Sequence, residues 1–268
     1  MTAAVSFDAG AAAYEWFMGR WSRLWVAALL EAARIGPGDV VLDMAAGTGV
    51  ATGPAAARVG PAGSVLATDT SLPMLAAARR PRRQPAGSPM AFIAMDGQEL
   101  ALREASVDAV ICLLGLMFLR DPVAGLREAR RALRPGRWLA AIVWSRPERV
   151  RFFSIAMEAL ARRRPDQREA LMVTFSLADA GRLVTAFEGA GLREVRVIPE
   201  RRNVTFESFD DYLDPIAAGG ARAGQLYQSL GPAARRAVDD EMRRALAPYE
   251  RDGRLVLETE ALLVAGRR

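Results

Sequence analysis

The sequence predicts an α/β protein with a doubly wound, mostly parallel sheet, and three observations lead to that fold class. Short apolar segments of strand character alternate with helical segments through the first 145 residues. A glycine-rich turn follows the first strand directly, as is typical of such sheets. The 268 residues, 51% of them hydrophobic, suffice for one large core with a smaller cap.

The predicted order opens with a helix over residues 14–34, because Trp21, Trp25 and Leu29 recur at helical spacing. A continuous apolar strand follows at 39–45 and suits the middle of a parallel sheet. The further elements predicted in this part are strands at 64–69, 90–96, 107–114 and 137–145, and helices after the glycine-rich turn, at 72–80, near Glu99 and at 121–134.

The 121–134 helix has the clearest signals, with Asp121 as N-cap, Pro122 at the first helical position and Pro135-Gly136 as its stop. Beyond residue 145 the expected elements are helices at 152–164, 179–190 and 232–246 and strands at 195–198 and 255–265. We expect the last two strands to extend the sheet as an edge pair, the final one antiparallel. The helices between residues 147 and 253 would form a lid or cap.

Missing residue types exclude many chemistries. The chain has no His and no Lys, so all 36 basic residues are Arg, and Cys112 is its single cysteine. Without Lys, a P-loop or a Schiff-base enzyme is excluded. Without His, there is no Ser-His-Asp triad and no imidazole metal ligand. We therefore predict no metal site.

Composition also bears on location and partners. The single cysteine forbids an intrachain disulfide, the start lacks a secretion signal, and the apolar runs are shorter than a membrane span, so we expect a cytoplasmic protein. The formal charge is +5, yet 31 acidic residues are interspersed with the arginines, which argues against nucleic acid as a partner. The sequence leaves the oligomeric state open.

A loop of small residues, Asp43-Met-Ala-Ala-Gly-Thr-Gly49, stands where the first strand ends and a helix begins. Small residues let the backbone approach a ligand closely, and a new helix offers unpaired N–H groups. Taken alone, the glycine spacing would also fit a dinucleotide-binding loop.

Acidic residues end the next two strands as well. Asp69 ends the second strand, about twenty residues after the loop, where a carboxylate can accept hydrogen bonds from ribose hydroxyls. Asp96, followed by Gly97, ends the third and could accept a hydrogen bond from an adenine amine. Three acidic strand ends favour a nucleoside without phosphates, because Asp43 would repel a pyrophosphate.

Together these motifs resemble the class I S-adenosylmethionine-dependent methyltransferases, in particular the quinone-methylating and small-molecule group. The resemblance covers about residues 14–145. It rests on the loop of Asp43 to Gly49, on Ala-Thr-Asp69-Thr-Ser-x-x-Met-Leu, on Asp96-Gly, on Val107-Asp-Ala-Val and on Leu126-Arg-Glu-Ala-Arg-Arg-Ala-Leu-Arg-Pro-Gly136. It implies a Rossmann-like fold in one domain, with a cofactor-binding core at 14–145, a lid with the sixth strand at 146–253 and the final strand at 254–268.

The resemblance implies a set of residues that bind S-adenosylmethionine. It places Asp43, Ala45, Gly47, Thr48 and Gly49 around the methionine part, Asp69 and Thr70 at the ribose, Met74, Asp96 and Gly97 at the adenine, and Leu113 beneath the cofactor. The segment from Tyr14 to Arg23 resembles the amino-terminal cover of the family. There Tyr14 would form a wall of the site and Arg23 would meet the cofactor carboxylate.

Two departures from the family patterns are informative. Ala45 replaces the first glycine of the commoner loop, as the quinone-methylating relatives tolerate. After the fourth strand the chain reads Cys112-Leu-Leu-Gly-Leu-Met, without the Asn/Asp-Pro-Pro-Tyr of enzymes that methylate base amines or Gln side chains. One cysteine also excludes arsenic methylation.

The implied function is methyl transfer to a small-molecule acceptor, mainly by alignment. No catalytic residue is assigned, and Tyr14, Glu15 and Tyr212 are candidates for a base. Alternatives are a sulfonium-assisted cyclisation or decarboxylation, a nicotinamide-dependent oxidoreductase and a pure binding module.

The acceptor pocket is expected in the cap, lined by aromatic residues of that region: Phe152, Phe153, Phe175, Phe206, Phe209 and Tyr212. An acidic acceptor is a further alternative, because Arg146, Arg149 and Arg151 follow the fifth strand.

Overall fold

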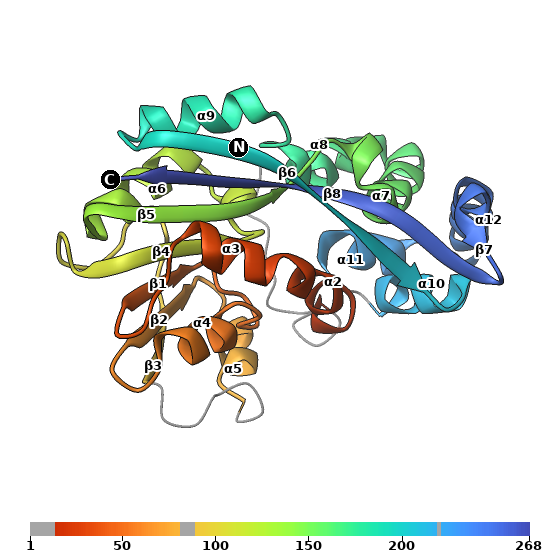
Figure 1. Cartoon of the computed structure of the whole chain (residues 1–268). Helices are drawn as coiled ribbons and strands as arrows, with labels where there is room; N and C mark the ends of the chain where they lie inside the picture. Colours follow the sequence, from red (N-terminus) through yellow and green to blue (C-terminus); the bar gives the residue numbers. More distant parts are fainter. Residues whose placement is uncertain (1–13, 81–88, 219–220) are drawn as a thin grey trace.

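The computed structural model describes residues 14–80, 89–218 and 221–268 and shows one twisted sheet flanked by helices, with a helical cap at one end (Figure 1). The strand order is β3-β2-β1-β4-β5-β8-β6, and β7 pairs with β8. The strands are β1 Val40–Met44, β2 Ser64–Asp69, β3 Met90–Ala94, β4 Val107–Leu113, β5 Leu133–Trp144, β6 Arg193–Phe206, β7 Glu250–Arg251 and β8 Arg254–Arg267.

The first five strands are parallel, and β8 runs antiparallel between β5 and β6. The predicted fold class is therefore confirmed, including the antiparallel final strand. The central strands β1 and β4 are buried almost throughout, as their continuous apolar sequences require. The edge strand β3 is half exposed.

Helices cover both faces of the sheet (Figure 1). On one face, α3 (Val26–Ala32) packs on β4, β5 and β8, while α4 (Thr52–Val59) and α5 (Leu72–Ala78) pack on β1, β2 and β3. On the other, α6 (Pro122–Ala132) packs on β5 and on α9 (Ala180–Gly189). The Asp121 carboxylate accepts hydrogen bonds from the N–H groups of Val123 and Ala124, as its predicted N-cap role requires.

The cap stands on a two-stranded extension of the sheet. The strand β5 ends at Trp144, opposite Ala261, but β6 and β8 continue together to the pair of Phe206 and Leu255. Around this ribbon gather α7 (Arg151–Arg163), α8 (Arg168–Met172), α10 (Phe209–Ala217), α11 (Ala221–Ser229) and α12 (Pro232–Leu246), as Figure 1 shows.

The predicted strand at 195–198 was far too short. The second half of β6 carries Arg201, Arg202 and Asn203, which hide its strand character in the sequence. An edge strand tolerates such polar residues because one side of it faces solvent.

Two predicted helices need correction. The segment 14–34 is not one regular helix: a wide π-type turn at Glu15–Gly19 leads through α2 (Arg20–Ser22) and a 3₁₀ turn into α3. Gly19 leaves room for the Glu15 carboxyl group, which a β-carbon would approach to 2.5 Å. No helix forms near Glu99, where only a turn is present.

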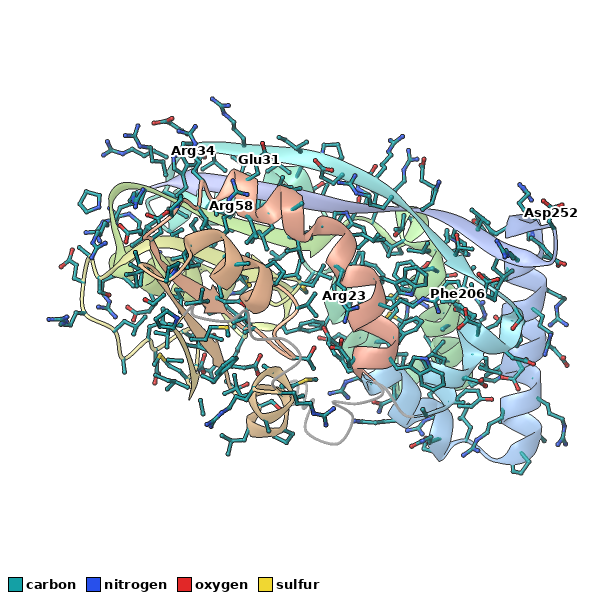
Figure 2. The ribbon with its side chains drawn as sticks, turned by 60° about the horizontal axis from the view of Figure 1, so that its bottom comes forward. Arg23, Glu31, Arg34, Arg58, Phe206 and Asp252 are labelled. Atoms are coloured by element: carbon teal, nitrogen blue, oxygen red, sulfur yellow. The ribbon has the colours of Figure 1, made fainter. Side chains whose placement is uncertain are left out.

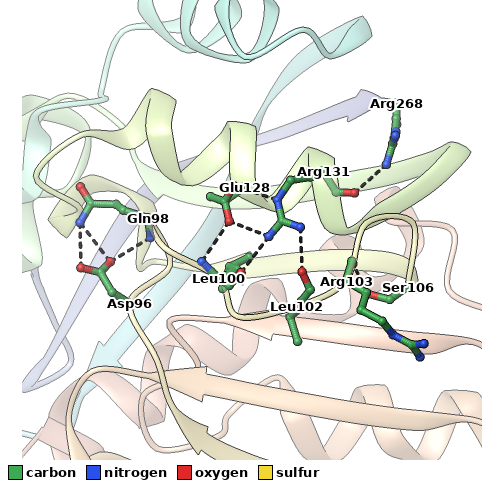
Figure 3. Close-up of polar contacts among 9 residues, drawn as sticks. All are labelled: Asp96, Gln98, Leu100, Leu102, Arg103, Ser106, Glu128, Arg131 and Arg268. Atoms are coloured by element: carbon green, nitrogen blue, oxygen red, sulfur yellow. Dashed lines mark hydrogen bonds and ion pairs between the residues drawn. The ribbon is translucent and has the colours of Figure 1, made fainter.

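The turn near Glu99 is held by side chains instead of helical hydrogen bonds (Figure 3). The Glu128 carboxylate accepts the Leu100 N–H at 3.1 Å, and Arg131 donates to the carbonyls of Leu100 and Leu102. These two α6 residues satisfy backbone groups that a helix would otherwise pair.

A cluster of rings joins the cap to the sheet and to the N-terminal segment. Phe152 of α7 is fully buried, with its ring centroid 5.6 Å from that of Trp144 and 6.0 Å from that of Phe17. Phe206, at the end of β6 and labelled in Figure 2, lies 5.0 Å from Trp21. We call Phe17, Trp21, Trp144, Phe152, Phe153 and Phe206 the aromatic cluster.

Candidate functional site

The carboxyl ends of the parallel strands meet at one edge of the sheet, and the loop after β1 lies there. Ala45, Gly47 and Gly49 all have positive φ, at 55°, 55° and 76°. A β-carbon on Gly47 would meet nothing within 4 Å, so this side of the loop is open. A β-carbon on Gly49 would lie 2.9 Å from that of Ala78, so Gly49 allows α5 to approach.

Two residues at this edge hold a conformation that disfavours a side chain. Ala45 follows β1, and Leu114 follows β4 with φ 57°. The turns touch, because a β-carbon on Gly115 would come within 2.5 Å of that of Ala45. Left-handed non-glycine residues cost about 1–2 kcal/mol each and are concentrated at functional sites.

Asp43 is completely buried beneath the loop. Its Oδ2 accepts a hydrogen bond from the Thr52 hydroxyl at 2.6 Å, while its buried Oδ1 has no partner in the described part of the chain. Burial raises the pKa of Asp43 to about 7; the Thr52 hydrogen bond opposes this, and the nearby Asp69 carboxylate adds to it.

Asp69 is the last residue of β2 and lies beside the loop that follows β1. Its carboxylate accepts the Gly47 N–H at 2.8 Å and the Ser71 N–H at 2.9 Å. Thr70 beside it is exposed, and Met74 is buried in the first turn of α5, which Ser71 caps. The second predicted acidic strand end is thus joined directly to the glycine loop.

Asp96 turns toward its own neighbour (Figure 3). Its carboxylate accepts the backbone N–H of Gln98 at 2.9 Å and the side-chain amide at 3.0 Å. The Gln98 Oε1 in turn accepts the Asp121 N–H at 2.7 Å. A β-carbon on Gly97 would lie 3.1 Å from the Met44 sulfur, so Gly97 allows close packing against β1.

The N-terminal segment lies over the glycine loop. The Glu15 carboxylate accepts a hydrogen bond from the Thr48 hydroxyl and forms an ion pair with Arg23 at 2.8 Å. Burial, together with the Asp69 and Glu15 carboxylates, raises the pKa of Tyr14. Figure 2 shows Arg23 on this segment, and its side chain is 60% exposed.

A cavity adjoins the loop between the N-terminal segment, β4, β5 and the cap. It measures about 480 Å³, counting the part open to solvent, and is lined mainly by apolar side chains that include Met18, Phe118, Trp144, Phe153 and Leu171. Tyr14 and Leu114 line it on the loop side. A smaller lobe shares Tyr14, Met18, Phe153 and Ala223 with it. Such a mainly apolar lining with a few polar groups is typical of sites for small organic molecules.

Only part of the predicted aromatic lining reaches the cavity. Phe153 lines both lobes. Phe152 and Phe206 belong to the aromatic cluster, and Tyr212 packs fully buried against Phe206 and Phe209. Among the described lining residues we find none of Phe152, Phe175, Phe206, Phe209 or Tyr212, so the prediction was wrong for these.

The site offers hydrogen-bond donors but little basicity. The raised pKa of Tyr14 keeps its hydroxyl protonated at neutral pH, and burial raises the pKa of Tyr212 likewise. Burial raises the pKa of the Cys112 thiol to about 12. No carboxylate belongs to the described lining of the cavity, and the described ranges hold no group of three or more His, Cys, Asp or Glu suited to a metal ion. The arrangement can align and enclose a reactant.

The sequence interpretation missed several residues. Leu114 adopts its left-handed conformation without a motif that announces it. Thr52 bonds to Asp43 from nine residues away, and Arg222 of α11 lines the cavity from the far end of the chain. Thr52, near the loop, could have been found as a polar residue at the start of α4.

The last residue of β4 was predicted to lie beneath the cofactor. This residue, Leu113, is half buried and precedes the cavity residue Leu114.

In the described ranges no single helix is long and apolar enough to cross a membrane. The stretches Pro165–Phe175 and Ala180–Gly189 have a sufficient length and apolar composition only when taken together, and they are bent by 68° relative to each other.

One family model and several curated proteins match part of this chain. Residues 41–136 match the family described as methyltransferase domain. The demethylmenaquinone methyltransferase of Beutenbergia cavernae is 38% identical over 125 residues, which are 47% of this chain and 49% of that protein. That of Mycobacterium sp. strain JLS is 36% identical over 143 residues, 53% of this chain and 58% of that protein. The chain thus spans about half the length of the curated relatives it matches.

Solved structures share the fold. A methyltransferase structure from Bacillus halodurans C-125 covers 90% of this chain and 97% of its own, with TM-score 0.61 and 20% identity. Haemonchus contortus phosphoethanolamine N-methyltransferase 2, in complex with S-adenosyl-L-methionine, covers 97% of this chain and 57% of its own, with TM-score 0.60 and 15% identity. These structures show that the fold is the Rossmann-like methyltransferase fold. The matched domain and the curated relatives, together with this fold, confirm the resemblance to class I methyltransferases.

Proposed function

With a methyltransferase domain at residues 41–136 as the premise, we propose that this chain transfers the methyl group of S-adenosylmethionine to a small hydrophobic acceptor. The observation that carries the proposal is the adjacency of two features at one sheet edge. An open glycine loop lies over a buried, half-unpartnered carboxylate, and an apolar cavity begins on the other side of Tyr14.

The residues of the loop fit the cofactor. The buried Oδ1 of Asp43 has no hydrogen-bond partner in the described residues, so a cationic donor from a ligand would satisfy it. Gly47 leaves the space above the loop open, and Asp69 accepts hydrogen bonds at its border. Asp43 and Asp69 together would repel a pyrophosphate, which speaks against a nicotinamide dinucleotide.

We assign the roles that the resemblance implies. Around the methionine part we place Asp43, Ala45, Gly47, Thr48 and Gly49, at the ribose Asp69 and Thr70, at the adenine Met74, Asp96 and Gly97, and beneath the cofactor Leu113, with Tyr14 as a wall. Arg23 pairs with Glu15 through one nitrogen. Its remaining N–H donors would meet the methionine carboxylate.

The acceptor would occupy the apolar cavity. S-adenosylmethionine supplies a methyl group bound to a sulfonium; a new bond forms from an acceptor electron pair to the methyl carbon as the C–S bond breaks and leaves its electron pair on sulfur. Tyr14 and Leu114 hold the acceptor against the loop, and the rings of Phe118 and Phe153 exclude water. The names of the relatives support a quinone-like acceptor.

A proton on the acceptor has to leave without help from a strong base. Tyr14 stays protonated, and no described carboxylate lines the cavity. The acceptor is therefore one that ionises in water, such as a phenol or enol, or an amine that is already free. We also propose a cytoplasmic location, which the single, buried Cys112 supports.

The test combines cofactor binding with product analysis. Purified protein is titrated calorimetrically with S-adenosylhomocysteine and with NADPH, and a labelled-methyl screen covers phenols, quinones, amines and carboxylic acids. We expect binding of the first ligand only, and label transferred to an acceptor. Detection of S-adenosylhomocysteine among the products separates methyl transfer from cyclisation or decarboxylation.

Asp69→Ala is the informative variant. We expect the dissociation constant for S-adenosylhomocysteine to rise roughly tenfold to a hundredfold, because a charged acceptor of hydrogen bonds is lost. Asp69→Asn is the control, since its amide oxygen can still accept the Gly47 N–H. Unchanged affinity in the alanine variant would refute this role of Asp69.

A further inference from the structure

The cavity contains one charged group that the proposed function does not use. Arg222, in the first turn of α11, lines the larger lobe with Thr174 and the apolar residues named above. Its Nε is buried without a hydrogen-bond partner, and Arg222 forms no ion pair in the part of the chain that the structure describes. Several other arginines of the cap are paired: Arg151 with Glu158, Arg162 with Glu241 and Arg243 with Asp210.

An arginine in this state needs a negative partner. The guanidinium is always protonated, and a buried donor left unpaired costs free energy. Three carboxylates of the cap region have other partners: Glu158 pairs with Arg151, Asp179 with Arg146, and Asp211 with Arg20. None of these carboxylates lines the described cavity.

The same pairings engage two of the three arginines that the sequence had offered for an acidic acceptor, and the third, Arg149, is not part of the described lining of the cavity. Arg146 is bound to Asp179 at 3.0 Å and Arg151 to Glu158 at 2.8 Å, and neither lines the cavity as described. The positive charge that faces an acceptor comes from α11 instead.

We infer that Arg222 binds an anionic oxygen of the acceptor, so that the cavity selects aromatic acceptors bearing a carboxylate or an ionised hydroxyl. This inference rests on the proposed function for the word acceptor, but the binding site itself does not depend on it. An aromatic body would lie between Phe118, Trp144 and Phe153, with its oxygen directed to the guanidinium, which matches planar oxyanions in a fork of donors. An anion held there also explains how an acceptor is ionised in a cavity without a base.

The test compares matched probes in matched variants. The probes are 1-hydroxy-2-naphthoate, its neutral amide 1-hydroxy-2-naphthamide, and 1-naphthol. The variants are Arg222→Gln and, as control, Arg236→Gln, which removes an exposed arginine from the neighbouring helix α12. Dissociation constants are measured by calorimetry with and without S-adenosylhomocysteine, and KM is measured for each probe that accepts a methyl group.

We expect wild type to bind the naphthoate at least tenfold more tightly than the amide, and Arg222→Gln to abolish that preference. Its naphthoate dissociation constant should rise roughly tenfold to a hundredfold, as for one lost charge-assisted pair, with the amide within about threefold. Arg236→Gln should behave as wild type. If the recognised oxygen is an ionised hydroxyl, 1-naphthol binding improves from pH 7 to pH 10 in wild type and not in Arg222→Gln.

A purely structural role for Arg222 predicts something different. Loss of a structural residue would lower the Tm and weaken all three probes alike, whereas removal of a guanidinium whose buried Nε has no partner should leave the Tm unchanged or raise it. Equal affinity of wild type for anionic and neutral probes, or an Arg222→Gln profile equal to that of Arg236→Gln, overturns the inference. Failure of the proposed function shows separately, as no binding of S-adenosylhomocysteine, while the probe titrations without it still test Arg222.

Discussion

The loop at the edge of the sheet and the cavity beneath the cap adjoin each other, yet they are built from different materials. The loop presents backbone, shaped by Ala45, Gly47 and Gly49 within five residues. The cavity presents side chains, and its walls come from the N-terminal segment, from β5 and from α7, α8 and α11. One is a local structure and the other is assembled from the whole chain.

This difference teaches where sequence motifs come from. A backbone site needs small residues at fixed spacing, so it leaves a pattern that can be read. A side-chain site needs only complementary volume, which many combinations of residues supply. It should follow that substitutions in the aromatic cluster act on the stability of the assembly, and substitutions in the loop on local conformation and ligand affinity.

The largest effect is expected from Phe152→Ala. Its fully buried ring contacts Trp144, Phe17 and Phe206, so its loss should lower the free energy of unfolding by about 3–5 kcal/mol. Urea denaturation measures this. If loop and cap are independent in this way, the folded Phe152→Ala variant binds S-adenosylhomocysteine with an affinity within about threefold of that of the wild type.

Phe92→Ala is the matched control, because this phenylalanine is only half buried on the edge strand β3. It should cost clearly less stability. Equal losses in the two variants, or a collapse of cofactor affinity in Phe152→Ala alone, would break the division between loop and cap.

The next effect concerns pH and Asp43. The folded state raises the pKa of this carboxyl to about 7 from 3.8, so the folded protein holds the proton more tightly than the unfolded chain. Its contribution to stability is therefore fully present below about pH 4 and is lost as the pH rises through 7, on the order of 4 kcal/mol. Asp43→Asn should flatten the stability curve over this range.

Urea unfolding of the wild type and of Asp43→Asn at pH 5, 6, 7 and 8 checks the prediction. Subtracting one curve of unfolding free energy against pH from the other cancels the contributions of the other carboxyl groups. Parallel curves would contradict it. A cationic ligand beside Asp43 should favour the ionised form, so cofactor binding near pH 6.5 should release protons, seen as a dependence of the calorimetric enthalpy on the buffer.

The smallest effect is expected from Ala45→Gly. Glycine adopts the positive φ of this position freely, so the variant should be more stable by up to about 1 kcal/mol. Ala105→Gly provides the match, since Ala105 also has a positive φ, 51°, but stands before β4 at the opposite end of the sheet. Both should gain stability, and only Ala45→Gly should alter cofactor affinity. A loss of stability in Ala45→Gly would show that the left-handed turn is not strained.

The same contrast explains what could be predicted from the sequence. The strand 64–69 was placed to the residue, and the acidic strand ends Asp43 and Asp69 do meet at the loop. These features are periodic or local. The length of β6 was not foreseen, because it depends on a partner far away in the chain, Leu255 of β8. The burial of Tyr212 was not foreseen either, because it depends on how α10 packs against the end of β6, where Phe206 lies.

The prediction of a helix near Glu99 was wrong for the same reason. Its polar residues suit a helix locally, but Glu128 and Arg131 supply tertiary partners for the backbone groups of Leu100. Arg222 shows the other limit: a lone arginine in a helix gives no sign in the sequence that it lines a cavity.

The unbroken course of β6 and β8 has a mechanical consequence. Each strand continues from the sheet to the cap without a linker, and they remain paired from Arg193 to Phe206. A truncation between cap and core would cut through hydrogen-bonded strands, so neither piece should survive as a soluble fragment under limited proteolysis. Scanning calorimetry should accordingly record a single melting transition, in which both parts lose their structure together.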